Sequence, residues 1–476
     1  MLFNSIQFLA FFPTVAILHY LSPHSFRRFI LLAASCIFYM AFIPYYILVL
    51  AATILVDYLA ALYIDGKAPK FRNAVLAVSI ATTCLILFVF KYFNFFVDNI
   101  IGLAEFLHWN YSLEALEIVL PLGLSFHTFQ SLSYVIEVYR RKQRAERNFL
   151  TYALYVMFFP QLVAGPIERP QNMLHQFHEK KSFNICNVYD GLSLMAWGFF
   201  KKLVVADRAA LLVNQIYNNI EGYSGGYLAI ATVFFAFQIY CDFSGYSDIA
   251  RGSAQVLGFK LMVNFDKPYF SKSISEFWRR WHISLSTWFR DYLYIPLGGN
   301  RASRARWQMN LFLTFLVSGL WHGANWTYVL WGALNGSYLL AAIWTGDLRT
   351  KVWSWTQLDR FPVFMNAIKI AVTFCLVSFS WIFFRAGSMH DVKYILANMF
   401  GKSSAVTPFD SYELALCAFF ICILVAIEMY EAGKTWLRRV LEGSILFRWG
   451  FDYALILVIL AFGVYDNPGK FIYFQF

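Results

Sequence analysis

The sequence predicts an all-α polytopic membrane protein, and three observations support this prediction. Hydrophobic residues occupy 59% of the 476 positions and charged residues only 14%, about half the charged share of a soluble domain. The apolar residues form continuous runs, whereas a transmembrane β-barrel would alternate apolar and polar positions. Aromatic residues reach 20%, which is typical of helices that face lipid with Phe and anchor at the interfaces with Tyr and Trp.

A helix crosses the hydrocarbon core with about 20 residues, and about eleven to twelve transmembrane helices are expected on this basis. In chain order the candidate spans are 4–21, 28–44, 46–64, 74–97, 116–138, 188–214, 226–244, 309–321, 326–344, 364–384, 411–429 and 451–466. Run 149–165 is also apolar, but Pro160, Gly165 and Pro166 interrupt it. Because irregular backbone survives at membrane depth only where protein or water surrounds it, we expect this run to be re-entrant.

Basic loops predict the orientation of these helices. Arg27 and Arg28 precede the second span, and five Lys and Arg residues lie between positions 140 and 147, after the fifth. The loop 98–115 contains neither Lys nor Arg. Because cytoplasmic loops are enriched in basic residues, the N-terminus is expected outside the cytoplasm. The same rule explains most of the net charge of +11, and the wide spread of the basic residues argues against nucleic-acid binding.

No internal repeat or low-complexity segment divides the chain. Residues 1–476 are therefore expected to form a single membrane domain, with the core motifs within 121–345. The seven cysteines lie mostly in apolar runs and form no Cys-x-x-Cys pair. They are typical of small buried hydrophobic residues rather than of disulfides or a metal site.

Segment 252–308 is the longest stretch that does not clearly span the membrane, and it contains a histidine among aromatic residues. Ser273 and Glu276 match the capping box of a helix start, and Pro296 should follow the end of that helix. His282 would then lie on the aromatic face of an amphipathic helix. An interfacial helix whose histidine only forms a hydrogen bond is the alternative interpretation.

Basic residues surround this predicted helix: Lys267, Lys272, Arg279, Arg280, Arg290, Arg301, Arg304 and Arg306. A cytoplasmic loop explains most of this charge. Guanidinium groups would also be needed to bind the phosphates of an acyl-CoA. The candidate donor-binding residues are therefore Arg279, Arg280, Arg290 and Arg301.

A second histidine, His322, lies between the apolar runs 309–320 and 326–344, with Trp321 before it and Gly323 after it. An ionisable ring in or beside a membrane usually has a function or a partner. A neutral imidazole can take a proton from a hydroxyl at physiological pH, as acyl transfer from a thioester to a hydroxyl requires. A histidine that only bonds a neighbouring helix is the alternative.

Two further stretches carry polar residues at depth. Asp248 and Arg251 lie three positions apart and could pair on a helix. The fifth span places four polar residues on one helical face: His127, Gln130, Ser131 and Tyr134. These four side chains could line a tunnel or bond adjacent helices, and the sequence favours neither interpretation.

Several of these stretches together resemble the membrane-bound O-acyltransferase (MBOAT) family, and more narrowly its bacterial branch of the alginate O-acetyltransferase type. The matching segments are 160–167, 238–248, 277–299, 321–326 and 471–476. The likeness covers essentially the whole chain, and the long central match is specific. The D-alanyl transferases of teichoic acid synthesis share the fold, but segment 292–299 looks more like the acetylating branch.

The resemblance implies a ring of tilted helices around a tunnel that joins the two faces of a bacterial inner membrane. It implies a catalytic histidine at His322 and a second motif histidine at His282. Acetyl-CoA from the cytoplasm would be the acyl donor, with no permanently bound cofactor and no metal. A periplasmic partner with a serine-hydrolase-like fold would complete the transfer to an exopolysaccharide such as alginate.

Two other classes of function remain open alongside an acetyltransferase. A transporter could use the same buried polar residues as a substrate path, and inverted repeats would support it, although none is visible in the sequence. A scaffold subunit of a polysaccharide export complex would tolerate the loss of both histidines. Release of free CoA by the purified protein would distinguish these classes directly.

Overall fold

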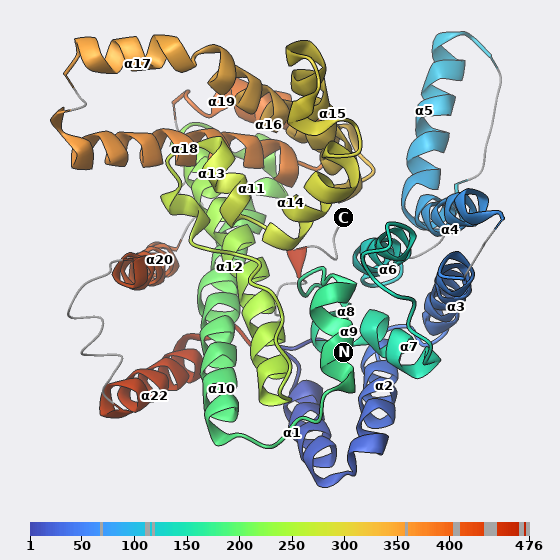
Figure 1. The fold of residues 1–476 in the computed structure, drawn as a ribbon. Helices are drawn as coiled ribbons and strands as arrows, with labels where there is room; N and C mark the ends of the chain where they lie inside the picture. The colour runs from blue at the N-terminus through green and yellow to red at the C-terminus, as the bar shows by residue number, and fades with distance from the viewer. Residues whose placement is uncertain are drawn as a thin grey trace. The chain divides into compact units, whose positions relative to one another are not determined.

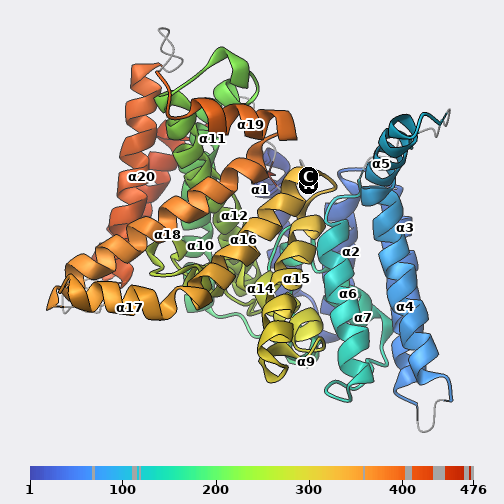
Figure 2. The same cartoon turned by 90° about the horizontal axis from the view of Figure 1, so that it is seen from above.

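The computed structural model describes residues 1–66, 70–109, 115–116, 120–357, 360–402, 410–432, 445–465 and 471–472. These residues form helices joined by turns and loops (Figures 1 and 2). No residue in the described ranges is assigned to a β-strand. The all-α prediction is therefore confirmed. Residues 473–476, which belong to one of the matching segments, lie outside the described residues.

The described chain forms two compact units, Met1–Met195 with Ser247–Met262, and Ala196–Tyr246 with Val263–Phe476. Helices α10 (Ile185–Phe199) and α12 (Gly226–Val256) contribute residues to both units. The single membrane domain expected from the sequence stays a prediction, as does the ring of helices around a tunnel.

The remaining helices of the first unit are α1 (Ile6–Leu21), α2 (His24–Met40), α3 (Tyr46–Ile64), α4 (Arg72–Leu87), η1 (Phe88–Tyr92), α5 (Phe93–Phe106), α6 (Leu124–Tyr139), α7 (Phe149–Met157), α8 (Phe159–Leu162) and α9 (Pro170–His178). The predicted interruption of run 149–165 is present, because one residue separates the end of α7 from the start of α8. Phe158 between them has a non-helical backbone (φ −53°, ψ 112°).

Buried hydrogen bonds to one carboxylate fasten three helices of the first unit. Asp57 of α3 is fully buried and accepts a hydrogen bond from Ser79 Oγ of α4 at 2.6 Å. It accepts another from Ser131 Oγ of α6. Tyr134 Oη of α6 accepts a hydrogen bond from Glu146 N at 2.9 Å. Gln130 Nε2 of α6 donates to Tyr155 O of α7 at 2.5 Å. Three of the four polar residues predicted on α6 therefore bond neighbouring segments, which supports the packing interpretation for them.

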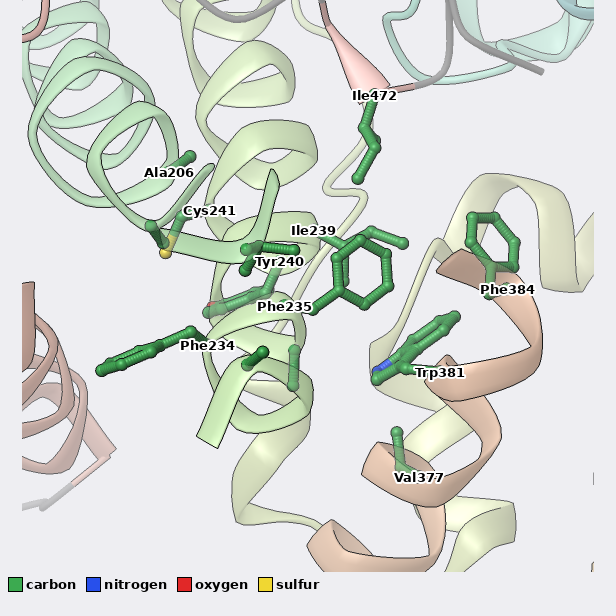
Figure 3. Packing of buried hydrophobic residues seen from close by; sticks show 14 of the residues in the cluster. Ala206, Phe234, Phe235, Ile239, Tyr240, Cys241, Val377, Trp381, Phe384 and Ile472 are labelled. Atoms are coloured by element: carbon green, nitrogen blue, oxygen red, sulfur yellow. The ribbon is translucent and has the colours of Figure 1, made fainter. Parts of the chain in front are cut away.

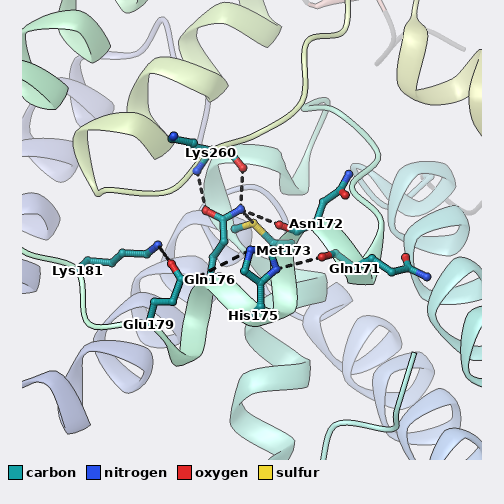
Figure 4. A network of polar contacts seen from close by, with 8 residues as sticks. All are labelled: Gln171, Asn172, Met173, His175, Gln176, Glu179, Lys181 and Lys260. Carbon is teal, nitrogen blue, oxygen red and sulfur yellow. Dashed lines mark hydrogen bonds and ion pairs between the residues drawn. The ribbon is translucent and has the colours of Figure 1, made fainter. Parts of the chain in front are cut away.

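A glutamine side chain clamps the segment that follows α12 onto α9 (Figure 4). Gln176 Nε2 donates to Lys260 O at 2.9 Å, and Gln176 Oε1 accepts from Lys260 N at 2.9 Å. The glutamine therefore pairs with Lys260 as a neighbouring β-strand would. Glu168 strengthens the attachment by accepting a hydrogen bond from Met262 N.

The remaining helices of the second unit are η2 (Phe200–Ala206), α11 (Asp207–Tyr217), η3 (Ile220–Gly222), η4 (Pro268–Phe270), α13 (Ile274–Arg280), α14 (Ile283–Phe289), η5 (Arg290–Tyr294), η6 (Gly299–Arg301), α15 (Arg304–His322), α16 (Trp326–Trp344), α17 (Gly346–Trp355), α18 (Pro362–Arg385), α19 (Met389–Asn398), α20 (Ser411–Ala432) and α22 (Ile445–Phe462). Their core is rich in aromatic rings. Figure 3 shows Phe235 and Ile239 of α12 on the side of their helix that faces Trp381 of α18. Burial of such rings against one another is the main apolar contribution to this unit.

Five helical segments in the described part of the chain are long and apolar enough to cross a membrane. They are Tyr46–Ile64, Arg72–Phe106, Gly226–Val256, Pro362–Arg385 and Ser411–Glu431. Several spans predicted from the sequence are shorter in the structure or are interrupted by π-helical turns. One example is the predicted span 188–214, where the π-helix η2 separates α10 from α11. The number of eleven to twelve crossings stays a prediction.

Candidate active site

His322 is the last residue of α15 and is 5% exposed. Its position depends on how the chain turns into α16. Gly323 is extended (φ −161°, ψ 151°), and a Cβ atom on it would lie 2.2 Å from the Tyr328 ring. Glycine is therefore required at position 323 for close approach and not for a positive φ. Asn325 then caps α16 by accepting a hydrogen bond from Thr327 N at 2.9 Å.

Helices α15 and α16 pack side by side along this turn (Figures 1 and 2). A Cβ atom added to Gly319 would lie 2.3 Å from Tyr328 O, and one added to Gly332 would lie 2.4 Å from Phe315 O. Both contacts are with backbone, which cannot move aside as a side chain could. The two glycines thus allow the helices to approach closely and fix the end of α15, where His322 lies.

Aromatic rings enclose the His322 side chain. The ring centroids of Trp321 and Trp331 each lie 5.0 Å from that of His322, and the Phe384 centroid lies at 5.3 Å. All three contacts are edge-to-face, the arrangement that aromatic quadrupoles favour. Trp331 comes from α16 and Phe384 from α18, so three helices hold the imidazole in an apolar pocket.

His282 lies in a different backbone setting, and the predicted amphipathic helix between Ser273 and Pro296 is wrong. The chain forms α13, breaks at Trp281 and His282, and continues as α14 and the π-helix η5. His282 has a left-handed backbone conformation (φ 43°, ψ 55°), which is uncommon outside glycine. The start was predicted correctly, since Ser273 Oγ accepts a hydrogen bond from Glu276 N at 3.1 Å. The end was also predicted correctly, since η5 ends at Tyr294, before Pro296.

Asn264 explains why the helix breaks. Its backbone oxygen accepts from Ile283 N at 2.9 Å, and its side-chain oxygen accepts from Ser284 N at 3.1 Å and from Ser284 Oγ at 2.9 Å. A residue distant in sequence therefore satisfies the first backbone donors of α14, which a continuous helix would have paired internally. Helix propensity and local capping carry no information about this partner.

The His282 ring is 1% exposed and packs against Phe243 of α12, with ring centroids 4.5 Å apart. Burial lowers the pKa of His282 to about 3, because a charged imidazolium is unfavourable away from water. The ring is therefore neutral at physiological pH.

The two histidines are connected by contacts between aromatic rings in the second unit. Phe265 stacks on His282 with centroids 6.3 Å apart and contacts Trp281 at 5.1 Å. Trp281 contacts Trp381 at 5.0 Å, Trp381 stacks on Trp331 at 5.8 Å, and Trp331 contacts His322. The structure thus places both sequence-predicted histidines in one aromatic layer.

A buried ion cluster in the second unit was missed by the sequence analysis. Lys202 Nζ lies 2.8 Å from Asp207 Oδ1 and 2.6 Å from Asp242 Oδ1, and all three side chains are buried. Asp242 Oδ2 also accepts a hydrogen bond from Ile472 N at 2.7 Å. Three charged residues inside the apolar runs 188–214 and 226–244 were the available signal, because such charges at depth usually pair.

The same cluster anchors the segment 471–472 next to His282. The centroid of the Phe471 ring lies 4.8 Å from that of Tyr246 and 5.8 Å from that of Phe243. Phe243 is the ring that contacts His282.

Asp248 and Arg251, further along α12, form the predicted ion pair, with Arg251 Nη1 3.1 Å from Asp248 Oδ1.

The four predicted donor-binding arginines lie at or near the surface of the second unit. Arg279, Arg290 and Arg301 are exposed and Arg280 is half-buried. Arg280 pairs with Glu276 at 2.7 Å and Arg290 with Asp291 at 2.8 Å. The neighbouring Arg304 starts α15 and His322 ends it. A helix of that length separates its ends by about 27 Å, so Arg304 and His322 lie far apart along α15.

Comparison with known proteins agrees with these motifs. The model of the MBOAT, membrane-bound O-acyltransferase, family matches residues 75–389. The chain is 38% identical to the probable alginate O-acetylase of Pseudomonas putida over 421 residues, which covers 87% of this chain and 82% of that protein. It is 33% identical to the peptidoglycan O-acetyltransferase of Helicobacter pylori, covering 84% and 80% of the two chains. It is 27% identical to the teichoic acid D-alanyltransferase of Bacillus subtilis, covering 56% and 69%.

The family model covers more than half of the chain, and the two acetyltransferase relatives are matched over most of their length. The resemblance first seen in the motifs is therefore confirmed, as are the O-acyltransferase class and the location in the bacterial inner membrane. The chain belongs to the membrane-bound O-acyltransferase family and is a multi-pass membrane enzyme that transfers acyl groups to oxygen.

Proposed function

We propose that this enzyme transfers acetyl groups from cytoplasmic acetyl-CoA across the inner membrane for O-acetylation of an exopolysaccharide such as alginate. The observation that carries the proposal is the buried, ring-enclosed His322 at the close-packed turn between α15 and α16. The names of the relatives support an acetyl group and a polymer acceptor, because alginate and peptidoglycan are both polysaccharides that such enzymes acetylate.

His322 acts as the general base in this proposal. Its imidazole takes the proton of the acceptor hydroxyl while the hydroxyl oxygen attacks the thioester carbonyl of acetyl-CoA. A C–O bond forms, the C–S bond breaks, and the thiolate of CoA receives the proton and leaves as the thiol. The apolar rings of Trp331 and Phe384 support this role, because a water-poor setting strengthens the electrostatic interactions of a catalytic group.

His282 has a positioning role in the proposal. It orients the thioester or helps to stabilise the oxyanion that develops on the carbonyl oxygen. A neutral ring supports either role, because its N–H group can donate a hydrogen bond to the thioester or to the developing oxyanion. The left-handed backbone also supports a position fixed by its surroundings, since strained residues persist only where neighbouring structure holds them.

The arginine side chains at the ends of α13 and η5 and in η6 bind the phosphates of acetyl-CoA in the proposal. Two of them already pair with carboxylates, Arg280 with Glu276 and Arg290 with Asp291. Both pairs are at least partly exposed, and ion pairs that reach solvent contribute only about 0–1 kcal/mol. A phosphate group could therefore replace the carboxylate at small cost. A periplasmic acetyltransferase partner then passes the acetyl group to the polymer.

Reconstitution tests the proposal. Purified protein in proteoliposomes is supplied with acetyl-CoA on the basic side, and release of the free thiol is measured with and without the periplasmic partner. We expect thiol release that depends on the partner or on an added polysaccharide acceptor. No thiol release from acetyl-CoA under any of these conditions would contradict the proposed donor. Release that is equally fast with other acyl-CoA donors would contradict the proposed acetyl specificity.

A further inference from the structure

A groove lies between α17 and α18 of the second unit, away from both histidines in sequence. It has a volume of about 310 Å³ and is lined by residues that include Trp353 of α17 and Met365, Asn366 and Lys369 of α18. The lining therefore combines an aromatic ring, an aliphatic chain, an amide and an ammonium group. Such a mixture suits a ligand with an anionic head and an apolar body.

The cationic part of the groove is built around Trp353. Lys369 Nζ lies 4.4 Å from the centroid of the Trp353 ring, and Arg349 Cζ lies 6.0 Å from it. Cation–π contacts of this kind hold a charge in place without neutralising it. Within the described ranges no carboxylate lies within ion-pair distance of Lys369, so its positive charge remains available to an anion.

Helix α17 has the features of a helix that lies on a membrane surface. Leu348, Val352 and Trp355 are spaced four and three residues apart on one helical face, and their exposed fractions are 62%, 44% and 84%. An exposed apolar face on a short helix with basic residues is typical of interfacial helices. The start of α18 continues this apolar surface, because Val363 is 83% exposed. An exposed apolar surface therefore borders the groove.

We propose that this groove binds an anionic phospholipid of the cytoplasmic leaflet. The lipid phosphate would accept hydrogen bonds from Lys369 and Asn366, and its glycerol and upper acyl chains would cover Met365 and Trp353. The cytoplasmic side follows from Arg349, Lys351 and the other basic residues of this loop. The leaflet facing the cytoplasm carries the negative charge that attracts such residues.

Native mass spectrometry of the purified full-length protein tests the proposal, with phosphatidylglycerol and phosphatidylcholine as the two probes. Lys369→Gln removes the charge and keeps a polar side chain. One basic residue near an anionic lipid is expected to change its affinity about five-fold. We expect binding of phosphatidylglycerol to weaken by about that factor and binding of phosphatidylcholine to stay unchanged. Lys393→Gln, at an exposed lysine of α19, is the matched control and should bind both lipids as the wild type does.

A second variant guards against a folding defect. Trp353→Leu keeps an apolar side chain but removes the ring beneath the ammonium group, and it should weaken phosphatidylglycerol binding in the same direction. Wild-type affinity for phosphatidylglycerol in both variants would overturn the proposal. Displacement of the bound lipid by CoA would overturn it as well, because the site would then belong to the phosphates of CoA.

Discussion

His322 and His282 lie in one aromatic layer, but the surrounding residues fix the side chain of His322 and the backbone of His282. At His322 the backbone belongs to a regular helix, and the rings of Trp331 and Phe384 fix the side chain. At His282 the backbone itself is left-handed, and Asn264 fixes it through hydrogen bonds to the following residues. We infer that replacing His322 removes the catalytic base while the surrounding backbone stays intact, whereas replacing His282 acts only through the positions of neighbouring groups.

The largest effect is expected for His322→Ala. Loss of a general base typically lowers turnover by about 10²–10⁴-fold, and the variant should still insert into the membrane, because α15 and α16 pack through their glycines. Thiol release by equal amounts of folded protein measures the effect. His390→Ala, at an exposed histidine of α19, should match the wild type. Near-normal acetylation of polymer in cells that produce His322→Ala would reject the assignment.

The buried ion cluster of Lys202, Asp207 and Asp242 tests whether the structure around His282 depends on these charges. Lys202→Met leaves Asp207 and Asp242 buried without their cation, and removal of one partner from such a cluster costs about 3–5 kcal/mol of stability. We expect a lower thermal midpoint together with reduced activity, because Asp242 and Phe243 both lie in the part of α12 that contacts segment 471–472. Lys393→Met at an exposed site is the control. An unchanged midpoint would show that the cluster does not hold this side of the unit.

Gly319 of α15 tests whether the close packing of α15 against α16 is needed around His322. Gly319→Ala would place Cβ 2.3 Å from Tyr328 O, and forcing an atom into packed backbone costs about 1–3 kcal/mol. Both the thermal midpoint and activity should fall. Gly102→Ala in α5 is the matched control, because its Cβ would meet nothing within 4 Å. Equal behaviour of the two variants would mean that the close approach of α15 and α16 is not needed.

A smaller effect is expected for the exposed arginines. Arg290→Glu should raise the KM for acetyl-CoA several-fold and change kcat little, because the lost interaction is with the bound ground state. The effect should weaken at high salt, since the site is exposed and salt screens exposed charges. Lys393→Glu makes the same charge change elsewhere and should leave KM unaltered. An unchanged KM in Arg290→Glu would show that this arginine serves membrane topology only.

The sequence predicted the class of fold because lipid imposes it: a chain with continuous apolar runs can only form helices in a bilayer. The sequence also indicated a candidate catalytic residue at His322, because a histidine followed by a glycine between two apolar runs is unusual. The break at His282 could not be predicted, since Asn264 satisfies the donors of α14 from eighteen positions before His282 in the chain. The capping signal at Ser273 was correct, but the helix that it starts, α13, has only seven residues.

The aromatic rings that surround His322 could not be predicted from the sequence either. Phe384 lies more than sixty positions after His322 and comes into contact only through the packing of α18 against α16. The same holds for Lys202 and Asp242, which pair across two helices. In each case the residues come into contact only when two helices pack together. The sequence of each helix does not specify which other helix it packs against.

The central claim is that His322 is the general base and His282 only a positioning residue. The comparison of His322→Gln with His282→Gln tests this claim most directly. Glutamine keeps a side chain that can form hydrogen bonds but cannot act as a base. The two variants are reconstituted at equal amounts of folded protein, and the rate of thiol release from acetyl-CoA is measured with the acceptor present. We predict that His282→Gln retains substantially more activity than His322→Gln. Equal and complete loss in both would indicate a shared chemical role, and a more active His322→Gln would contradict the assignment of His322 as the base.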